Sequence, residues 1–260
     1  MGTDLEAAKL VLCEVTQGVA SVTLNDPGRR NVLSLDLSRA LIDTVEHLAR
    51  RDDVKVLVVS GSGTVFCAGA ELDVLLAAGD GDLTGIELVY AAFGAIAEFP
   101  KPTIAAVNGP AVGAGLNLAL ACDVRIAATS ARFDCRFLTI GIHQGGGHAW
   151  MLSRLVGPQT AAAMLTFGQI ISGKESVERG LAWAECADED LLRIAQDFAA
   201  RAAKASHVLL ADMKSSLRHT PDLPSRAEAM AIETDRQLAS LRRPEAEELI
   251  KRMRALISKS

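Results

Sequence analysis

Aromatic residues are scarce in this sequence. Only 4% of its 260 residues are Phe, Trp or Tyr, too few for the stacked rings that single-stranded nucleic acids require. The net charge of −5 at pH 7 also argues against a surface that attracts a phosphate backbone. We therefore expect no nucleic-acid partner, although a ligand that carries phosphates would still require local Lys or Arg side chains.

Paired cysteine motifs are lacking as well. The five cysteines are odd in number and contain no CxxC pair: Cys13, Cys67, Cys122, Cys135 and Cys186. The first residues lack the pattern of a secretion leader, because Asp4, Glu6 and Lys9 interrupt it. Both features predict reduced thiols and a cytoplasmic protein without disulfides or a zinc knot.

Residues 102–122 contain no charged side chain, and a stretch of this length could cross a bilayer. However, Asn108, Gly109 and Pro110 lie in its middle, where lipid would leave backbone polar groups without partners. A strand, a turn and a helix of small residues explain the stretch better. We expect no membrane span.

The N-terminal part alternates between strand and helix patterns, and half of the residues are hydrophobic, enough for a large core. Strands are predicted over 11–15, 19–24, 54–59, 103–107 and 124–127, and helices over 35–50, 86–99 and 113–121. This alternation indicates an α/β fold.

The pattern changes near residue 191, after which no strand is predicted. Three helical segments follow, with breaks at Pro221, Pro224 and Pro244. We therefore predict a core over residues 1–190, and a helical region over 191–260 that packs on the core or against another subunit.

Two turns rich in Gly and Ala have the same construction. Residues 65–72 and 108–117 each follow a strand and precede a helix. Small residues let a ligand approach the main chain, and the amides of a first helical turn can serve an anion. Both could simply be tight turns. A dinucleotide site is excluded, because the GxGxxG that starts at Gly113 ends in Leu118.

Several segments in order resemble the enoyl-CoA hydratase/isomerase, or crotonase, family. They are LNDPGRRNVLS (24–34), FCAGAEL (66–72), NGPAVGAGLNLALACDVRIA (108–127), GGGHAWMLSRLVG (145–157) and ISGKESVERGLAWA (171–184). The resemblance covers nearly the whole chain. It implies an α/β spiral of ββα units with a helical C-terminal region, assembled as a homotrimer or a dimer of trimers.

The resemblance also implies a binding site for an acyl-CoA thioester, with no permanently bound cofactor and coenzyme A entering as part of the substrate. The backbone amides of Ala70 and Ala114 would form an oxyanion hole for the thioester carbonyl. The predicted substrate and CoA-binding residues are Arg29, Arg30, Val32, Ala68, Gly69, Leu72, Gly113, Asn117 and Phe137. Arg29 or Arg30 would contact a phosphate or be a solvated loop charge.

The sequence departs from family hydratases at two catalytic positions. Where those enzymes carry glutamates, this chain has Asn117 and Phe137. Each general acid or base contributes about 10²–10⁴ in rate, so efficient hydration by the usual route is not expected. His143, just before a glycine run, is the favoured substitute acid/base, against the alternative of a structural histidine.

Other candidates are weaker. His148 could cap a helix rather than act on the substrate, and Asp134 could pair with Arg132 or Arg136. Glu71 is interpreted as a residue that shapes the pocket rather than as a base. His143 and His148 are five residues apart with no flanking carboxylate, so no metal site is predicted. Cys67 and Cys122 are interpreted as buried small hydrophobes, since no histidine adjoins them in sequence.

Two functions remain open. The chain could be an enzyme with hydratase- or isomerase-type activity on an acyl-CoA, which stabilises a thioester enolate and uses an unusual acid/base group. It could instead be a non-catalytic or weakly catalytic acyl-CoA carrier. The missing glutamates favour the carrier, whereas the two turns suit both. A structural subunit without a ligand leaves the open turns unexplained.

Overall fold

The described residues, 9–258 of a computed structural model, contain two sheets. The larger has the order β1-β2-β3-β4-β6-β9: β1 (Val11–Thr16), β2 (Val19–Leu24), β3 (Val56–Gly61), β4 (Thr103–Val107), β6 (Val124–Ala128) and β9 (Ala184–Cys186). Its first two strands are antiparallel and the others parallel. The smaller sheet has the order β5-β7-β8: β5 (Pro110–Val112), β7 (Arg132–Asp134) and β8 (Ile171–Ser172). The predicted α/β class is confirmed.

The first hairpin forms where the sequence predicts it. Gln17 and Gly18 have φ of 51° and 83°, the positive values that a tight turn between twisted strands requires. Further along, β3 and β4 are buried apart from Gly61, as expected for parallel strands covered on both faces. The uncharged stretch 102–122 is β4, β5 and α4 (Ala114–Ala121). No helix within residues 9–258 combines the length and apolarity needed to cross a membrane.

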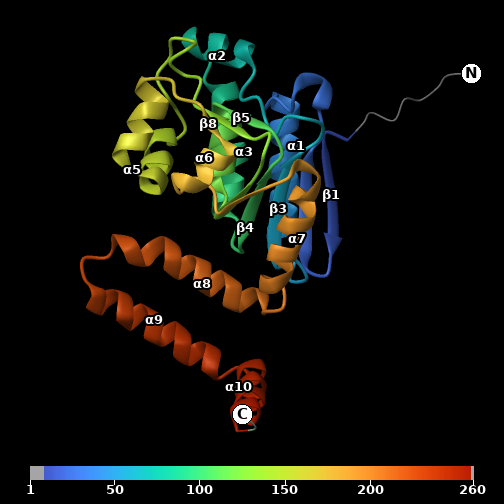
Figure 1. Ribbon diagram of the computed structural model, residues 1–260, viewed down its shortest axis with the longest axis vertical. Coiled ribbons are helices and arrows are strands. Elements are labelled where there is room, and N and C mark those ends of the chain that lie inside the picture. Colours follow the sequence, from blue (N-terminus) through green and yellow to red (C-terminus); the bar gives the residue numbers. More distant parts are fainter. Residues whose placement is uncertain (1–8, 259–260) are drawn as a thin grey trace, which may run out of the picture. The chain divides into compact units, whose positions relative to one another are not determined.

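Helices cover both faces of the larger sheet (Figure 1). On one face lie α1 (Leu35–Ala49), with its predicted apolar stripe buried, and α3 (Thr84–Glu98). On the other lies α7 (Leu191–Ala202). Neighbouring residues of β3 show the division: Leu57 joins the α1 side and Val58 the α7 side. This alternation follows from the two-residue period of a strand.

The remaining helices of this part are α2 (Leu72–Gly79), α5 (His148–Thr166) and α6 (Gly173–Glu178). A break at Gly157, whose φ is 73°, and Pro158 divides α5. Ser172 and Glu175 form a capping box at the start of α6. Short 3₁₀ turns lie at Pro27–Arg29, Asp188–Asp190 and Thr220–Asp222.

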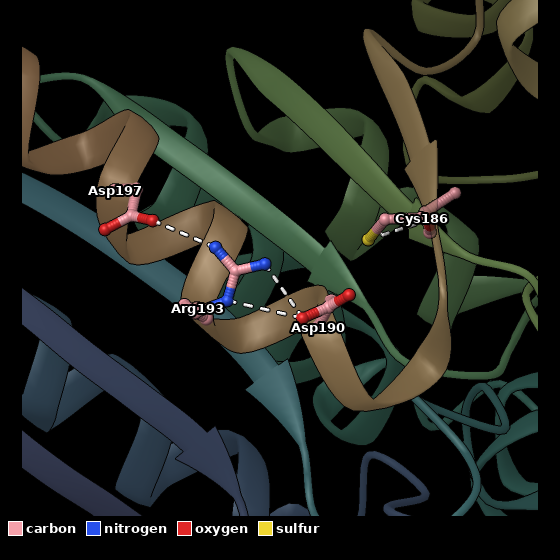
Figure 2. Close-up of polar contacts among 5 residues, drawn as sticks. Cys186, Asp190, Arg193 and Asp197 are labelled. Carbon is pink, nitrogen blue, oxygen red and sulfur yellow. Dashed lines mark hydrogen bonds and ion pairs between the residues drawn. The ribbon is translucent and has the colours of Figure 1, made fainter.

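The start of α7 carries a chain of ion pairs (Figure 2). Arg193 lies 2.8 Å from Asp190 and 3.3 Å from Asp197, and these contacts raise its pKa. All three side chains are exposed, so the contribution to stability is small. Nearby, the Cys186 thiol approaches the Ala127 carbonyl at 3.9 Å. None of the five cysteines is bonded to another in the structure.

A buried cation fixes the far end of α4. The Arg125 guanidinium donates to the carbonyls of Leu181 at 2.6 Å and Cys122 at 2.7 Å, with a longer contact to Ala119 at 3.4 Å. Its side chain therefore satisfies carbonyls at the end of α4 and in the segment before β9. Losing these bonds would leave buried acceptors without donors.

The chain divides into two compact units between Lys204 and Ala205. The second unit consists of α8 (His207–His219), α9 (Arg226–Leu241) and α10 (Pro244–Ile257). Within it, Arg243 pairs with Asp212 at 2.9 Å. The expectation of three helical segments after residue 191 is wrong, since the described part of this region has four α-helices. The missed break has no proline; Ser206 starts α8 by accepting from the Leu209 amide.

Candidate active site

The first of the two predicted turns follows β3 and leads into α2. A bridge between Leu33 and Ala70 and a hydrogen bond from the Leu33 amide to the Gly69 carbonyl (2.7 Å) fix its path. Gly69 has a φ of 104°, and a Cβ there would lie 2.9 Å from the Val112 carbonyl oxygen. Both the conformation and the space require glycine.

The second turn joins β5 to α4 and lies directly against the first. Cys67 and Ala111 form a bridge between the turns, and the Val112 amide donates to the Cys67 carbonyl at 3.0 Å. Gly113, with φ 52° and ψ −115°, reverses the chain so that α4 begins at Ala114. The main-chain bonds between the turns therefore set the positions of Ala70 and Ala114 together.

Ala70 and Ala114 line one cavity of about 120 Å³. Among the described residues, neither backbone N–H donates a hydrogen bond to another group of the chain. The Ala114 amide belongs to the first turn of α4, whose donors have no partner inside the helix. The turns thus supply two unused donors at one cavity.

The rest of the cavity wall is mostly apolar. The other lining residues are Ala68, Gly69, Leu72, Leu75, Ile86, Tyr90, Val112, Gly113, Asn117, Cys135, Arg136, Phe137, Ile140, Ile142, His143 and Gly145. None of these is a carboxylate. Inside such a wall a hydrogen bond to a developing negative charge is stronger than in water.

A more open hollow adjoins this cavity. It shares Ala68, Ala70 and Leu72 with the cavity and adds Arg29, Arg30 and Val32. The structure therefore brings five of the predicted substrate and CoA-binding residues to one surface: Arg29, Arg30, Val32, Ala68 and Leu72. Glu71, the residue before α2, also lines this hollow and forms an ion pair with Arg29.

Asn31 fixes the loop that carries these arginines. It is fully buried with a φ of 52°, and its side-chain amide donates to the carbonyls of Ser62 (2.9 Å) and Val65 (2.7 Å). Its Oδ1 accepts from the Asp26 amide at 2.9 Å. The side chain thereby connects the arginine loop to the segment that leads into the first turn.

We expect Asn31→Ala to lower the midpoint of thermal unfolding by roughly 10 °C. The change leaves two carbonyls and one amide without their partners, which lowers the free energy of unfolding by about 3 kcal/mol. Each kcal/mol lowers the midpoint by about 2–4 °C in a protein of this size. Circular dichroism would measure the midpoint. Asn25→Ala, which removes one exposed bond to the Lys9 carbonyl, is the control and should have a small effect. Equal shifts in the two variants would contradict this role of Asn31.

His148, Asn117 and Cys135 form a buried polar cluster beside the cavity. His148 Nε2 lies 3.2 Å from the Cys135 Sγ, and Nδ1 bonds to Asn117 Oδ1. The ring also meets Phe137 edge-on, with 5.0 Å between ring centroids. Burial lowers the pKa of His148 to about 4, and burial, with a smaller effect of the Asp134 charge, raises that of Cys135 to about 12. At neutral pH both groups are uncharged.

The buried imidazole predicts a loss of stability in acid. In the unfolded chain His148 binds a proton as the pH falls through 6.5, whereas in the folded protein it does so only near pH 4. The free energy of unfolding therefore decreases as the pH falls from 6.5 to 4. We expect a contribution of about 2 kcal/mol to be lost by pH 5. Urea unfolding at pH 7 and pH 5 would measure it. His148→Gln should reduce the difference and exposed His47→Gln should not; an unchanged difference in His148→Gln would assign it elsewhere.

The histidines differ in placement from some expectations. His143 lines the cavity, is exposed, and has its Nδ1 2.7 Å from the Gln144 carbonyl. His148 begins α5, as expected, but its side chain makes no cap, because it turns toward Asn117 and Cys135 instead. Asp134 pairs with Arg136, one of its two predicted partners. No metal-binding group of His, Cys, Asp or Glu occurs among the described residues.

Two residues of the cavity wall, Cys135 and Tyr90, were not identified as site residues from the sequence. Cys135 and His148 are 13 positions apart, so adjacency in sequence could not reveal their contact. Tyr90 on α3, the single tyrosine of the chain, also lines the cavity. From the helical pattern alone it cannot be distinguished from a core residue. Only its hydroxyl group distinguishes it as a possible site residue. Cys67 and Cys122 are buried, as predicted.

Comparison with known proteins gives consistent results. The model of the enoyl-CoA hydratase/isomerase family matches residues 14–251. A probable enoyl-CoA hydratase of Mycobacterium tuberculosis is 43% identical over 242 residues, which cover 90% of this chain and 93% of that protein. The 1,2-epoxyphenylacetyl-CoA isomerase of Escherichia coli is 33% identical over 196 residues, or 74% of this chain and 75% of the relative.

Solved structures agree with this assignment. An enoyl-CoA hydratase from Bacillus anthracis has a TM-score of 0.88 at 26% identity, over 95% of this chain and 96% of that one. One from Polaromonas has a TM-score of 0.87 at 29% identity, over 96% and 97%. The resemblance seen in the sequence and the crotonase fold are thus confirmed. The chain belongs to the enoyl-CoA hydratase/isomerase family, a branch of the crotonase superfamily.

Proposed function

We propose that this chain binds an acyl-CoA thioester and catalyses a hydratase- or isomerase-type reaction through a thioester enolate. The observation that carries the proposal is the pair of unused backbone amides, Ala70 and Ala114, at one mostly apolar cavity. They would receive the thioester oxygen as negative charge develops on it. One such donor contributes about 3–4 kcal/mol to the transition state.

The adjoining hollow is the proposed site for the rest of the ligand. Its cationic residues are Arg29, Arg30 and Arg136, which outnumber its two carboxylates, Glu71 and Asp73. Its apolar part includes Val32 and Leu72. This distribution suits a molecule with phosphates at one end and an apolar arm that reaches toward the cavity. Coenzyme A enters as part of the substrate, and the proposal needs no permanently bound cofactor. Gly69 and Gly113 would let the acyl group approach the main chain.

The proton transfers need a group other than the usual glutamates. Asn117 and Phe137, which replace them, both line the cavity, and no carboxylate within residues 9–258 does. His143 is the proposed acid/base, because it lines the cavity and an imidazole is the side chain that most often serves as a general acid or base. Asn117 and Phe137 would contact the acyl group.

An assay with a 2-enoyl-CoA tests this function. Loss of the conjugated thioester absorbance of crotonyl-CoA and a longer 2-enoyl-CoA, with a 3-hydroxyacyl-CoA product, would support hydration. Migration of the double bond, identified by mass spectrometry and NMR, would support isomerisation. Saturable binding with neither product would favour a second function, that of an acyl-CoA carrier. The absence of a carboxylate from the cavity wall is the observation that favours the carrier.

We propose in addition that the full chain assembles as a homotrimer or a dimer of trimers through its helical C-terminal region. The second unit exposes large apolar side chains on each of its helices, among them Leu217, Met230 and Met253. Light scattering after size-exclusion chromatography should therefore give three or six times the chain mass of 27.4 kDa. Leu249→Glu with Met253→Glu on α10 should lower the mass, while Glu248→Gln should not. A monomeric wild-type protein would contradict the proposal.

A further inference from the structure

A polar cluster at the cavity includes two side chains, Cys135 and His148, to which the hydratase- or isomerase-type reaction gives no role. Cys135 follows β7, Asn117 lies on α4 and His148 begins α5. Their side chains meet at 3.2 Å between the thiol and Nε2, and by a hydrogen bond between Nδ1 and Asn117 Oδ1. Cys135 and Asn117 line the cavity that holds Ala70 and Ala114.

The hydrogen bonds give this cluster a direction. The Asn117 side-chain amide donates to the Gly145 carbonyl at 3.1 Å, so the other end of the side chain, Oδ1, is an acceptor. The proton on the imidazole therefore belongs to Nδ1, which donates to Oδ1. The lone pair of Nε2 then faces the Cys135 thiol. This order of thiol, imidazole and orienting amide is the one that activates a nucleophile for acyl transfer.

The main chain at Cys135 also lies beside the segment that carries the Ala114 amide. Val112 of β5 pairs in register with Asp134 of β7, and the Gly113 amide donates to the Asp134 carbonyl at 2.9 Å. Gly113 and then Ala114 follow Val112 on the first segment, and Cys135 follows Asp134 on the second. Paired strands are about 4.8 Å apart. Cys135 and Ala114 also line the same cavity, so a carbonyl carbon whose oxygen meets the Ala114 amide would face the same space as the thiol.

We propose that Cys135 is a nucleophile that takes the acyl group from the bound thioester. The proposal rests on acyl-CoA binding at this cavity. The Cys135 sulfur would attack the thioester carbon as its proton passes to His148 Nε2, and the oxygen would become an oxyanion between the Ala70 and Ala114 amides. When the bond from carbon to the CoA sulfur breaks, His148 returns the proton to that sulfur. The products are acyl-Cys135 and free CoA.

Water would complete the cycle. With His148 accepting its proton, water attacks the acyl-cysteine carbonyl, the bond to the Cys135 sulfur breaks, and the thiol recovers the proton. The net reaction is hydrolysis of the thioester to a carboxylic acid and CoA, without an oxidant or reductant. The resting pair is uncharged, since burial raises the thiol pKa and lowers the imidazole pKa. The nucleophile therefore forms only during attack.

Butyryl-CoA tests the proposal separately from hydration, because a saturated acyl chain has no double bond to hydrate or move. Intact-mass spectrometry of the full-length protein should show a butyryl adduct that hydroxylamine removes, with release of CoA measured by chromatography. Cys135→Ala should lose the adduct and lower CoA release about 100-fold or more. Cys122→Ala, another buried cysteine, and Cys13→Ser, an exposed one, should keep both signals.

The possible outcomes separate this inference from the function on which it rests. Isothermal titration of the Cys135→Ala protein should show butyryl-CoA binding that differs little from the wild type. Binding without an adduct on Cys135, and with CoA release equal to that of Cys135→Ala, would overturn the nucleophile and leave the acyl-CoA site standing. No binding by the wild-type protein would overturn both. Cys135→Ser provides a further check: a hydroxyl-linked butyryl adduct supports the attack geometry, and its absence together with normal release overturns it.

Discussion

Replacing Ala114 by proline is expected to lower kcat/KM for a 2-enoyl-CoA by about 10²–10³ without unfolding the protein. Ala114 is the first residue of α4, a position where proline is well tolerated because its missing N–H has no helical partner. The residue before a proline prefers an extended backbone. Gly113 has φ 52° and ψ −115°, the mirror image of that conformation, and glycine can adopt the mirror image because it has no Cβ. The change removes the proposed oxyanion donor itself.

Arg226→Pro is the matched control for this variant. Arg226 is the first residue of α9, and Ser225 before it is extended, so proline fits there too. Both variants should unfold near the wild-type temperature, but only Ala114→Pro should lose turnover. Wild-type kcat/KM in Ala114→Pro would remove the Ala114 amide from the mechanism. A large loss in Arg226→Pro would show that proline at a helix start disturbs the protein by another route.

His143→Ala is expected to lower kcat by about 10² or more while leaving acyl-CoA affinity nearly unchanged. His143 lines the cavity, but Arg29 and Arg30, which are proposed to contact the CoA phosphates, lie in the adjoining hollow. Removing the ring therefore takes away a proton acceptor without removing the main binding contacts. Steady-state rates with crotonyl-CoA and titration with a saturated acyl-CoA would measure the two quantities.

The control for His143→Ala is His47→Ala, since His47 is exposed in the last turn of α1 and does not line the cavity. Unchanged turnover in His143→Ala would exclude His143 as the acid/base and leave Tyr90 and the Cys135–His148 pair as the proton-carrying groups at the cavity. Equal losses of kcat and affinity would instead indicate that His143 acts in binding.

The sequence predicted those parts of the fold that local chemistry controls. The hairpin at Gln17 and Gly18, the apolar stripe of α1 and the strand β4 follow from turn residues and hydrophobic periodicity, and the structure has them at those positions. The break between α7 and α8 was missed because a serine cap, rather than proline, starts the second helix. Caps of this kind are common in loops as well, so they are weak signals in sequence alone.

The site shows a similar division. Small residues drew attention to the two turns, because close approach to a main chain requires them, whereas the resemblance to the family singled out Ala70 and Ala114, which line one cavity. The cluster of Cys135, His148 and Asn117 was not predicted, since its members come from three elements and meet only through the packing of α4 and α5 beside β7. No spacing rule connects residues that tertiary structure brings together.

The buried Arg125 has a consequence for how ligand affinity can change. α4 is eight residues long, about 12 Å, with the Ala114 amide at one end and Arg125 bonded to carbonyls at the other. A short helix moves nearly as a rigid rod, so a slight tilt at its anchored end would shift the amide relative to Ala70. Selection for altered acyl-CoA preference should therefore recover substitutions at Arg125 or around Leu181, which line neither the cavity nor the adjoining hollow.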